Sequence, residues 1–359
     1  MATQDTIYNG NENSCCKLIE VALEQIPQTK YSTSGALEAL RASTQAFSGR
    51  IDITAGGSRP NGTGQRKIYT KATVPVCTDT TPTFDICDAP TFGASTANPE
   101  KWVEHTIDLS ISREFVFSNE EYREFCSNTA EVYARLINAH RSGVQTEISN
   151  KIIQALITYM GAYAHQTSPD NSIATPLDIN LFNDVAQGYS GYALIKDQYA
   201  KLGYTMDTPI ILGGSSVAVS MDANRRGVGY NQAGYAPDML PPSSYIDYGV
   251  NTAFGDTLDH LLTFIPGTFI LAQWNDVTPQ FASDSRLKGN EASILFSPFG
   301  DGLNWDFQKL LSDNACQHVI RMKAHFGVLC PVPYNECALK PALHFQANCT
   351  PNPCVSTLP

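Results

Sequence analysis

The pattern closest to a catalytic site is Gly-Gly-Ser-Ser at residues 213–216, which follows an apolar run at residues 209–212. In many hydrolases a nucleophilic serine lies on such a turn between a strand and a helix, within the pattern Gly-x-Ser-x-Gly, and neither flank fits here. A serine nucleophile also needs a positioned base, and His105, His140 and His260 stand in unrelated contexts. We interpret the segment as a tight strand–helix turn and keep an unrecognised hydrolase as an alternative.

A second chemical pattern is the Gly-x-x-x-x-Gly spacing of a phosphate-binding loop at residues 57–63. Thr63 stands where the loop needs a lysine to meet the phosphate charge, and we interpret the segment as the flexible base of a hairpin. Glu120, Glu121 and Glu124 fall at a predicted helix start, where carboxylates interact favourably with the helix dipole. They indicate capping, and the sequence predicts no catalytic residue.

Cysteines near the end of the chain raise the hypothesis of a zinc site. Cys330, Cys337, Cys349 and Cys354 have His344 among them, with intervening gaps of six, eleven and four residues. Paired ligands of structural zinc sites are usually separated by about two to four residues. We therefore expect reduced or late-oxidising cysteines, no metal ion, no cofactor and no cofactor-binding residue.

Composition narrows the functional classes. The 359 residues carry 24 Lys+Arg against 35 Asp+Glu, a net charge of −11, and only 16% are charged. The low charge argues against a disordered chain, and the acidic balance argues against a sequence-reading nucleic-acid binder. Residues 1–10 lack the features of a signal peptide, and the longest nearly apolar stretch, 261–274, is too short and too interrupted to span a membrane. We expect a soluble protein made in the cytoplasm, without membrane contact.

The clearest structural element is a long helix. Apolar residues recur about every fourth position from Val132 to Met160, which predicts a helix over residues 129–162, roughly 50 Å long at about 1.5 Å per residue. We call such a helix a spine helix, because one side of it can pack along a sheet or a partner. We interpret His140, which lies on this stripe, as a core or interface histidine. Gly143 in the middle weakens the helix by up to about 1 kcal/mol.

Two strand-like segments precede this helix. Residues 65–77 alternate between apolar and polar, and residues 101–117 do so over a longer reach, with a phase break before Phe115. A long Pro- and Thr-rich stretch separates them, so we predict a two-stranded hairpin that projects from the body. A hairpin of this kind is only marginally stable alone in water and needs a neighbour to lie on.

Shorter patterns complete the prediction. We expect helices at 18–26, 34–46, 118–125, 178–188, 191–202 and after residue 216, and strands at 209–212, 261–265, 269–274, 293–296 and 317–329. Residues 224–249 are predicted to form a surface loop without an element of its own. The last thirty residues, which contain six prolines, are predicted to wrap over a surface.

The order of these parts resembles the major capsid proteins of tailed phages with the Hong Kong 97-type fold. Residues 65–117, 118–162 and 175–240 carry the resemblance, and within the last the segments Ala-Lys-Leu-Gly at 200–203 and Thr-Pro-Ile-Ile-Leu-Gly-Gly-Ser-Ser at 208–216 look like a helix leading to a central strand. The resemblance implies an α+β chain with an N-terminal arm, an extended hairpin loop, a long spine helix and an α/β axial domain. It also implies a shell protein with no enzymatic activity.

On this resemblance the chain divides into six parts. They are an N-terminal arm (1–48), the extended hairpin with the first peripheral-domain strand (49–117), a peripheral domain with the spine helix (118–172), an axial domain (173–305), a returning peripheral strand (306–330) and a Cys/Pro-rich tail (331–359). The implied partners are further copies of the chain, in hexamers and pentamers, together with portal, scaffolding and possible decoration proteins and packaged double-stranded DNA held by non-specific contacts. The implied location is the virion capsid, after synthesis in the host cytoplasm.

Other functional classes remain alternatives. A tail-tube or other virion protein would consist mostly of strands and would lack the long helix. An adhesin-type binding protein would agree with the many Thr and Pro residues, but it should carry an export signal, and the first ten residues show none.

Overall fold

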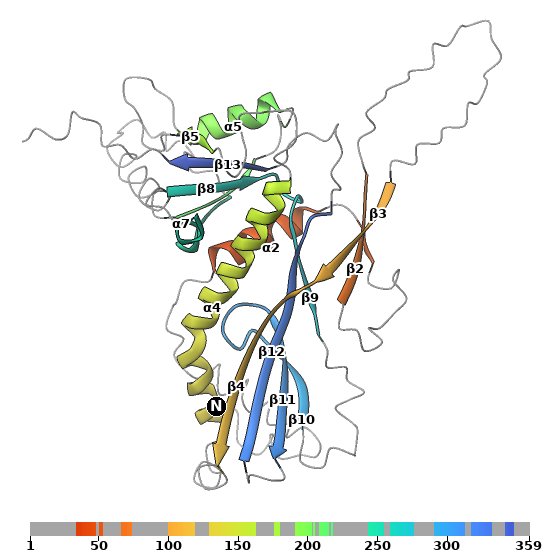
Figure 1. The fold of residues 1–359 in the computed structure, drawn as a ribbon, viewed down its shortest axis with the longest axis vertical. Coiled ribbons are helices and arrows are strands. Elements are labelled where there is room, and N and C mark those ends of the chain that lie inside the picture. The colour runs from red at the N-terminus through yellow and green to blue at the C-terminus, as the bar shows by residue number, and fades with distance from the viewer. Residues whose placement is uncertain are drawn as a thin grey trace, which may run out of the picture. The chain divides into compact units, whose positions relative to one another are not determined.

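The computed structural model describes residues 34–47, 50–52, 66–73, 100–118, 129–162, 176–179, 191–202, 204, 208–214, 217, 243–254, 259–275, 291–312, 317–331 and 342–347. The chain divides into two compact units, which are described separately below. Unit 1 comprises Met1–Ser34, Ile107–Lys151 and Ala272–Gly327, and unit 2 comprises Gly35–Thr106, Ile152–Leu271 and Val328–Pro359. Helices and strands occur together, which confirms the mixed helix-and-sheet class (Figure 1).

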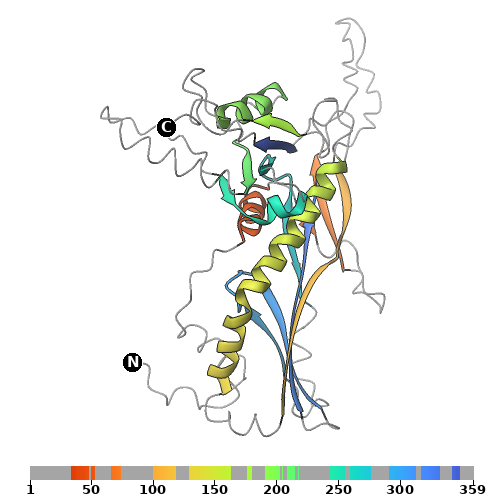
Figure 2. The same cartoon turned by 60° about the vertical axis from the view of Figure 1, so that its left-hand side comes forward.

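Unit 1 is built on an antiparallel sheet with the strand order β10-β11-β12-β4, and β9 (Ile270–Trp274) also pairs with β12. The strands are β4 (Leu109–Ser118), β10 (Glu291–Phe296), β11 (Asn304–Ser312) and β12 (Gln317–Leu329). The first part of α4 (Thr129–Ala162), up to Lys151, runs beside these strands (Figure 1, Figure 2).

Strand alternation separates the two faces of this sheet. Side chains of consecutive residues point to opposite faces, and cross-strand partners share a face. One face is apolar and closed, and we call it the helix-side face. Its buried members are Ile111, Leu295, Trp305, Phe307, Ile320, Met322, Ala324 and Phe326. Burial of these aromatic and branched side chains is the main favourable contribution to the stability of unit 1.

The helix α4 has the bounds that the sequence predicts, but its buried stripe runs differently in the N-terminal half. Ala134, Ile137, Arg141, Val144 and Ile148 are buried, whereas His140 is exposed. The core alternative for His140 is therefore wrong, and its place in an interface between molecules stays a prediction. Its ring contacts the edge of Phe115 at a centroid distance of 5.3 Å. A helix turn of 3.6 residues makes a strict four-residue spacing drift off the face, and Arg141 takes the inward position.

The segment 101–117 is two strands rather than one. β3 (Glu100–Ile107) ends before Asp108 and lies in a different sheet from β4. The predicted phase break before Phe115 is absent, because Arg113 lies on the same face as Ile111 and Phe115. A charged residue is tolerated there because its guanidinium binds Glu147 of α4. The apparent break in the sequence is thus an ion pair facing the helix.

Unit 2 contains a mixed five-stranded sheet in the order β5-β13-β8-β6-β7. Its strands are β5 (Leu177–Ile179), β6 (Ile210–Gly213), β7 (Ser244–Ile246), β8 (Asp259–Phe264) and β13 (Ala342–Ala347). Its helices are α2 (Gly35–Ala46), α5 (Gly191–Lys201), α7 (Gly249–Phe254) and the remainder of α4. One face of the sheet packs on α5 through a core of Ile179, Ile195, Tyr199, Ile211, Val217, Leu261, Ile265, Leu343 and Phe345.

A single carboxylate joins two helix starts in unit 2. Asp247 is 8% exposed and accepts hydrogen bonds from the backbone N–H groups of Ala36 and Gly249, both at 3.0 Å. These groups belong to the first turns of α2 and α7, where backbone donors have no partner within the helix. Gly35 allows the close approach, because an added Cβ would collide with the carbonyl oxygen of Ile246.

The remaining sheet of unit 2 has the order β1-β2-β3, with β1 (Arg50–Asp52) antiparallel to β2 (Arg66–Thr73). β2 and β3 are the two strands of the predicted hairpin. Pairing of these strands was correctly predicted, and β1 was not predicted. Residues between β2 and β3 lie outside the described part of the chain.

Three predictions in unit 2 were wrong. Residues 177–179 form a strand instead of a helix start, because Leu177 and Ile179 pair with β13. The predicted loop 224–249 contains β7, which pairs in parallel with β6. The end of the chain does not only wrap over a surface, because β13 is a buried inner strand of the sheet. In each case a short segment of ambiguous pattern becomes a strand because it has a neighbour to pair with.

Most of the other short elements agree with prediction. The helices α2 and α5 and the strands β6, β8, β9, β10 and β12 lie where the sequence indicates, while α7 and β11 were not predicted. The predicted helix at 118–125 does not begin at Ser118, which ends β4. Residues 119–125, the predicted helix at 18–26, the rest of 178–188 and the phosphate-loop pattern at 57–63 lie outside the described residues.

Candidate functional site

The second face of the unit 1 sheet carries exposed apolar side chains. We call it the open face. Its members are Ser112, Glu114 and Val116 of β4, Val319, Arg321 and Lys323 of β12, Asn304, Asp306 and Gln308 of β11, and Ile294 and Phe296 of β10. They alternate with the buried residues of the helix-side face, and most of them are exposed or half-buried, whereas Asp306 and His325 of the same face are buried.

Large apolar side chains are exposed on the open face. Phe296 is 70% exposed, Val116 is 50% exposed and Ile294 is 39% exposed. Phe296 and Ile294 are two residues apart on β10, so their side chains are neighbours, and Val116 lies on β4 at the other end of the strand order. Adjoining exposed apolar side chains, as Ile294 and Phe296 are, occur at surfaces that bind another protein. The arrangement can therefore contribute to association.

One ion pair on the open face connects β4 with β12. Arg321 donates from Nε and from a terminal nitrogen to Glu114 Oε2, at 3.0 and 2.9 Å, across neighbouring strands. Both side chains are close to half exposed, so the pair contributes at most about 1 kcal/mol to folding. Both contacts converge on the same carboxylate oxygen and connect β12 with β4 at paired positions of the two strands.

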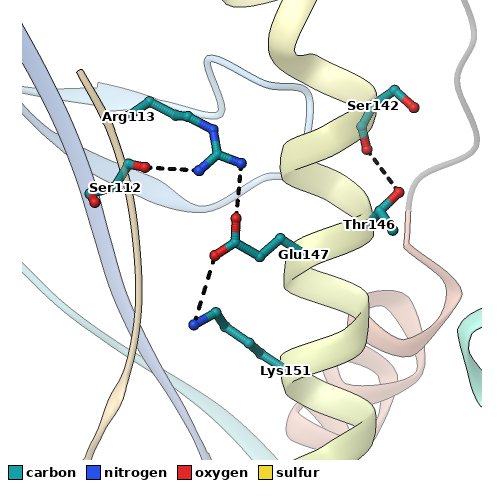
Figure 3. Close-up of polar contacts among 6 residues, drawn as sticks. All are labelled: Ser112, Arg113, Ser142, Thr146, Glu147 and Lys151. Atoms are coloured by element: carbon teal, nitrogen blue, oxygen red, sulfur yellow. Dashed lines mark hydrogen bonds and ion pairs between the residues drawn. The ribbon is translucent and has the colours of Figure 1, made fainter. Parts of the chain in front are cut away.

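On the helix-side face an ion-pair network connects β4 with α4 (Figure 3). Arg113 donates to Glu147 Oε2 at 2.9 Å and to the backbone oxygen of Ser112 at 2.8 Å. Lys151 lies one turn after Glu147, with its ammonium 3.8 Å from the other carboxylate oxygen. One carboxylate thus bridges a strand cation and a helix cation, which fixes the helix along the sheet.

The β2–β3 hairpin has its own polar cluster. Glu104 accepts a hydrogen bond from the Tyr69 hydroxyl at 2.7 Å and pairs with the Lys67 ammonium at 2.5 Å. Hydrogen bonds from Lys67 and Tyr69 hold the pKa of Glu104 below its usual value. On the other side of the strands, His105 is buried and lies 2.7 Å from the Thr70 hydroxyl. These cross-strand pairs specify the hairpin register close to its base.

The structure does not bring the suggested catalytic residues together. His105 contacts Thr70, His140 contacts Phe115, and His260 bonds to His344 at 2.9 Å. The turn after β6 is close-packed at Gly213, where an added Cβ would collide with Val217. Residues 215 and 216 lie outside the described part of the chain. Gly213 is therefore explained by packing.

Cys330 is buried, and His344 bonds to His260. The other tail cysteines lie outside the described residues. Among the residues that the structure does describe, no three His, Cys, Asp or Glu side chains gather as metal ligands would.

Within the described ranges, no helix has the combination of length and apolar character needed to cross a bilayer.

Sequence reasoning missed the open face. The segment 293–296 was correctly predicted as a strand, and its alternation marks Ile294 and Phe296 as sharing a face. Exposure depends on what covers that face in three dimensions, which the local pattern does not contain.

No protein-family model and no curated protein matches the chain. Among solved structures, the chain is similar to one from Mycobacterium phage Cain, with 14% identity, a TM-score of 0.45, and coverage of 91% of this chain and 94% of that one. It is also similar to the mature capsid of bacteriophage PhiM1 (10% identity, TM-score 0.39, 80% and 83% coverage) and to the satellite phage P4 procapsid (8%, 0.37, 92% and 96%). All of these solved structures come from bacteriophages, and the last two are capsids.

Proposed function

We propose that this chain is a structural subunit of a tailed-phage capsid with the Hong Kong 97-type fold, and that it is not an enzyme. The order of its described elements supports the proposal. A hairpin of β2 and β3 is followed by α4, which at 34 residues is the longest described element, then by β5 to β8 of the unit 2 sheet and by the returning strand β12, after which β13 completes the unit 2 sheet. This is the order on which the sequence resemblance depends.

The long helix favours this function over the alternatives. A tail-tube protein would lack a spine helix, whereas α4 spans Thr129–Ala162. A hydrolase using the turn after β6 would need a histidine base, and His105 and His260 are engaged with Thr70 and His344 instead.

The observation that carries the proposal is the exposed apolar content of the open face. Unit 1 closes one face of its sheet with α4 and leaves Phe296, Ile294 and Val116 in contact with solvent. A protein that assembles gains stability by covering such residues with a second copy, because burial of apolar area is favourable by about 25 cal/mol per Å². We assign the open face a role in contacts between copies.

The finer organisation follows from the same proposal. The chain then has six parts in order. They are the arm (1–48), the extended hairpin (49–117), the peripheral domain (118–172), the axial domain (173–305), the returning strand (306–330) and the tail (331–359). Packing of α2 on β6 and β7 supports an arm that ends against the axial domain. Copies assemble into hexamers and pentamers of an icosahedral head around double-stranded DNA. Portal, scaffolding and decoration proteins are its further partners, and it is made in the host cytoplasm.

A pair of matched variants tests the role of the open face. Phe296→Asp places a charge on the most exposed apolar side chain of that face, and Leu194→Asp does the same on α5, where Leu194 is 42% exposed. We expect Phe296→Asp to abolish particles in sedimentation and negative-stain microscopy while the urea midpoint of the soluble chain stays unchanged. Leu194→Asp should assemble like the unsubstituted chain. Normal assembly of Phe296→Asp would refute the role of the open face.

A further inference from the structure

One arginine of unit 1 is enclosed without a partner. Arg141 of α4 is 7% exposed, and its Nε atom is buried without a hydrogen-bond partner. Within the described part of the chain, no hydrogen bond or ion pair involves its terminal nitrogens either. Buried polar atoms are paired in the large majority of cases, so an unpaired guanidinium in this position calls for an explanation.

The loop between β10 and β11 packs directly on this guanidinium. Residues 297–303 lie beside α4 (Figure 1, Figure 2), and the Gln145 amide, one helix turn after Arg141, donates to the Phe299 carbonyl oxygen at 3.0 Å. Gly300 has φ +67°, and an added Cβ would collide with the Nη2, Cζ and Nε atoms of Arg141. The missing side chain of Gly300 therefore leaves the room that the guanidinium occupies.

Carboxylates of the same elements have other partners. Asp301 of the loop accepts a hydrogen bond from the indole N–H of Trp305 at 2.7 Å. Glu147 of α4 pairs with the Arg113 guanidinium at 2.9 Å. Among the described residues, neither carboxylate forms an ion pair with Arg141, so the guanidinium lacks a bound counter-ion there.

The chemistry of the guanidinium defines the missing partner. The group is positively charged at neutral pH, and its terminal nitrogens form a planar fork that matches the two oxygens of a carboxylate. A buried charge without a counter-ion lowers the stability of the isolated chain, and a carboxylate that binds it restores the loss. Arg141 therefore favours association with an anion over packing within the free chain.

We propose that Arg141 is a recognition site for a carboxylate side chain of a second copy of this chain. The source of the carboxylate rests on the proposed function, in which copies associate. Each copy has 35 Asp+Glu against 24 Lys+Arg, so every contact between copies brings an excess of carboxylates. The loop that contacts Arg141 directly follows Phe296, which is 70% exposed on the open face. A single side chain can reach a guanidinium that is 7% exposed, whereas the phosphates of a DNA duplex lie along a broad rod.

Nuclear magnetic resonance of the arginine Nε–H groups in the soluble full chain tests the site directly. The Arg141 signal is identified by its loss in Arg141→Met. Acetate, inorganic phosphate and chloride are added separately at neutral pH and constant ionic strength. We expect acetate to shift the Arg141 signal saturably, at concentrations about tenfold lower than those that shift the other arginine signals, because charges attract more strongly away from water. Chloride should give no saturable shift.

Two results of this titration overturn the proposal. Absence of a saturable acetate shift means that no carboxylate site is open at Arg141 in the soluble chain. A shift with phosphate alone assigns the site to phosphate groups and excludes the carboxylate.

The stability of matched variants separates recognition from packing. Arg141→Met keeps an unbranched side chain and removes the charge, and Arg135→Met makes the same substitution at an exposed position of α4. We expect the urea midpoint of the soluble chain to rise in Arg141→Met and to change little in Arg135→Met. A fall of the midpoint in Arg141→Met overturns the proposal, because Arg141 then stabilises the isolated chain.

Assembly of the same variants tests the second copy as the source. We expect Arg141→Met to raise the chain concentration at which particles form by about tenfold or more, because a buried charge pair is lost at the contact. Arg141→Lys keeps the charge without the fork and should lie between, and Arg135→Met should assemble like the unsubstituted chain. Normal assembly of Arg141→Met overturns the second copy as the source. If the unsubstituted chain forms no particles, the proposed function fails and the second copy with it, while the acetate titration still decides whether Arg141 binds a carboxylate.

Discussion

Loss of the Asp247 carboxylate should destabilise unit 2 more than loss of an ordinary surface acid. The carboxylate accepts from Ala36 N and Gly249 N, both at 3.0 Å, and is 8% exposed. Asp247→Ala leaves two backbone donors at helix starts without this acceptor. Removing a single cap costs about 1 kcal/mol, and a buried unsatisfied donor costs about 1–3 kcal/mol. We therefore expect Asp247→Ala to lower the free energy of unfolding by about 2–4 kcal/mol.

Asp247→Asn separates the two bonds. The amide keeps one acceptor oxygen, so one helix start remains capped and the other faces an N–H₂ group. We expect a loss of about half that of Asp247→Ala. Both are measured by urea unfolding of the soluble chain with circular dichroism, with Glu114→Gln on the open face as the control, where the expected loss is below about 1 kcal/mol. We expect the free energy of unfolding of Asp247→Ala to lie about 2 kcal/mol or more below that of the unsubstituted chain. A difference below about 0.5 kcal/mol would refute the double-cap reasoning.

Three further predictions follow from single positions. Gly143→Ala should stabilise α4 by about 0.5–1 kcal/mol. Nothing lies within 4 Å of an added Cβ, and alanine reduces the conformational freedom of the unfolded chain. A lower urea midpoint would contradict this prediction. Gly300→Ala should destabilise unit 1, because Gly300 has φ +67° and an added Cβ would meet the Arg141 guanidinium; an unchanged melting temperature would contradict it. Burial lowers the pKa of His105 in the folded chain below 6.5, so the unfolded chain binds the proton more readily. The free energy of unfolding therefore falls as the pH decreases through 6.5. His105→Gln should flatten the decline of the urea midpoint between pH 7 and 5, and an identical decline would exclude His105 as a cause.

Long, regular patterns were predictable from the sequence. The bounds of α4 were predicted correctly because its apolar residues recur over about eight turns, and β12 was predicted because its alternation persists over thirteen residues. Even in α4, the sequence did not show which side chains are buried. His140 is exposed and Arg141 is buried, because small differences between a four-residue spacing and the helical repeat accumulate along the helix.

Short strands were not predictable, because pairing partners rather than local pattern create them. β7 has three residues and depends on β6, while β13 lies in a Pro-rich end and depends on β5 and β8. The contact between His260 and His344 joins residues 84 positions apart, so neither histidine has a local signal for it. The same holds for Arg113, which looks like an interruption in a strand until Glu147 of α4 is placed beside it.

The most direct test of the proposed function is the mass of the particles formed by the full chain. The chain is expressed alone and with candidate scaffolding partners, and the product is weighed by light scattering and imaged by negative-stain microscopy. A capsid subunit should give rings of five or six copies, or closed shells of megadalton mass. A product that remains a stable 39.1 kDa monomer under all of these conditions would contradict the proposal.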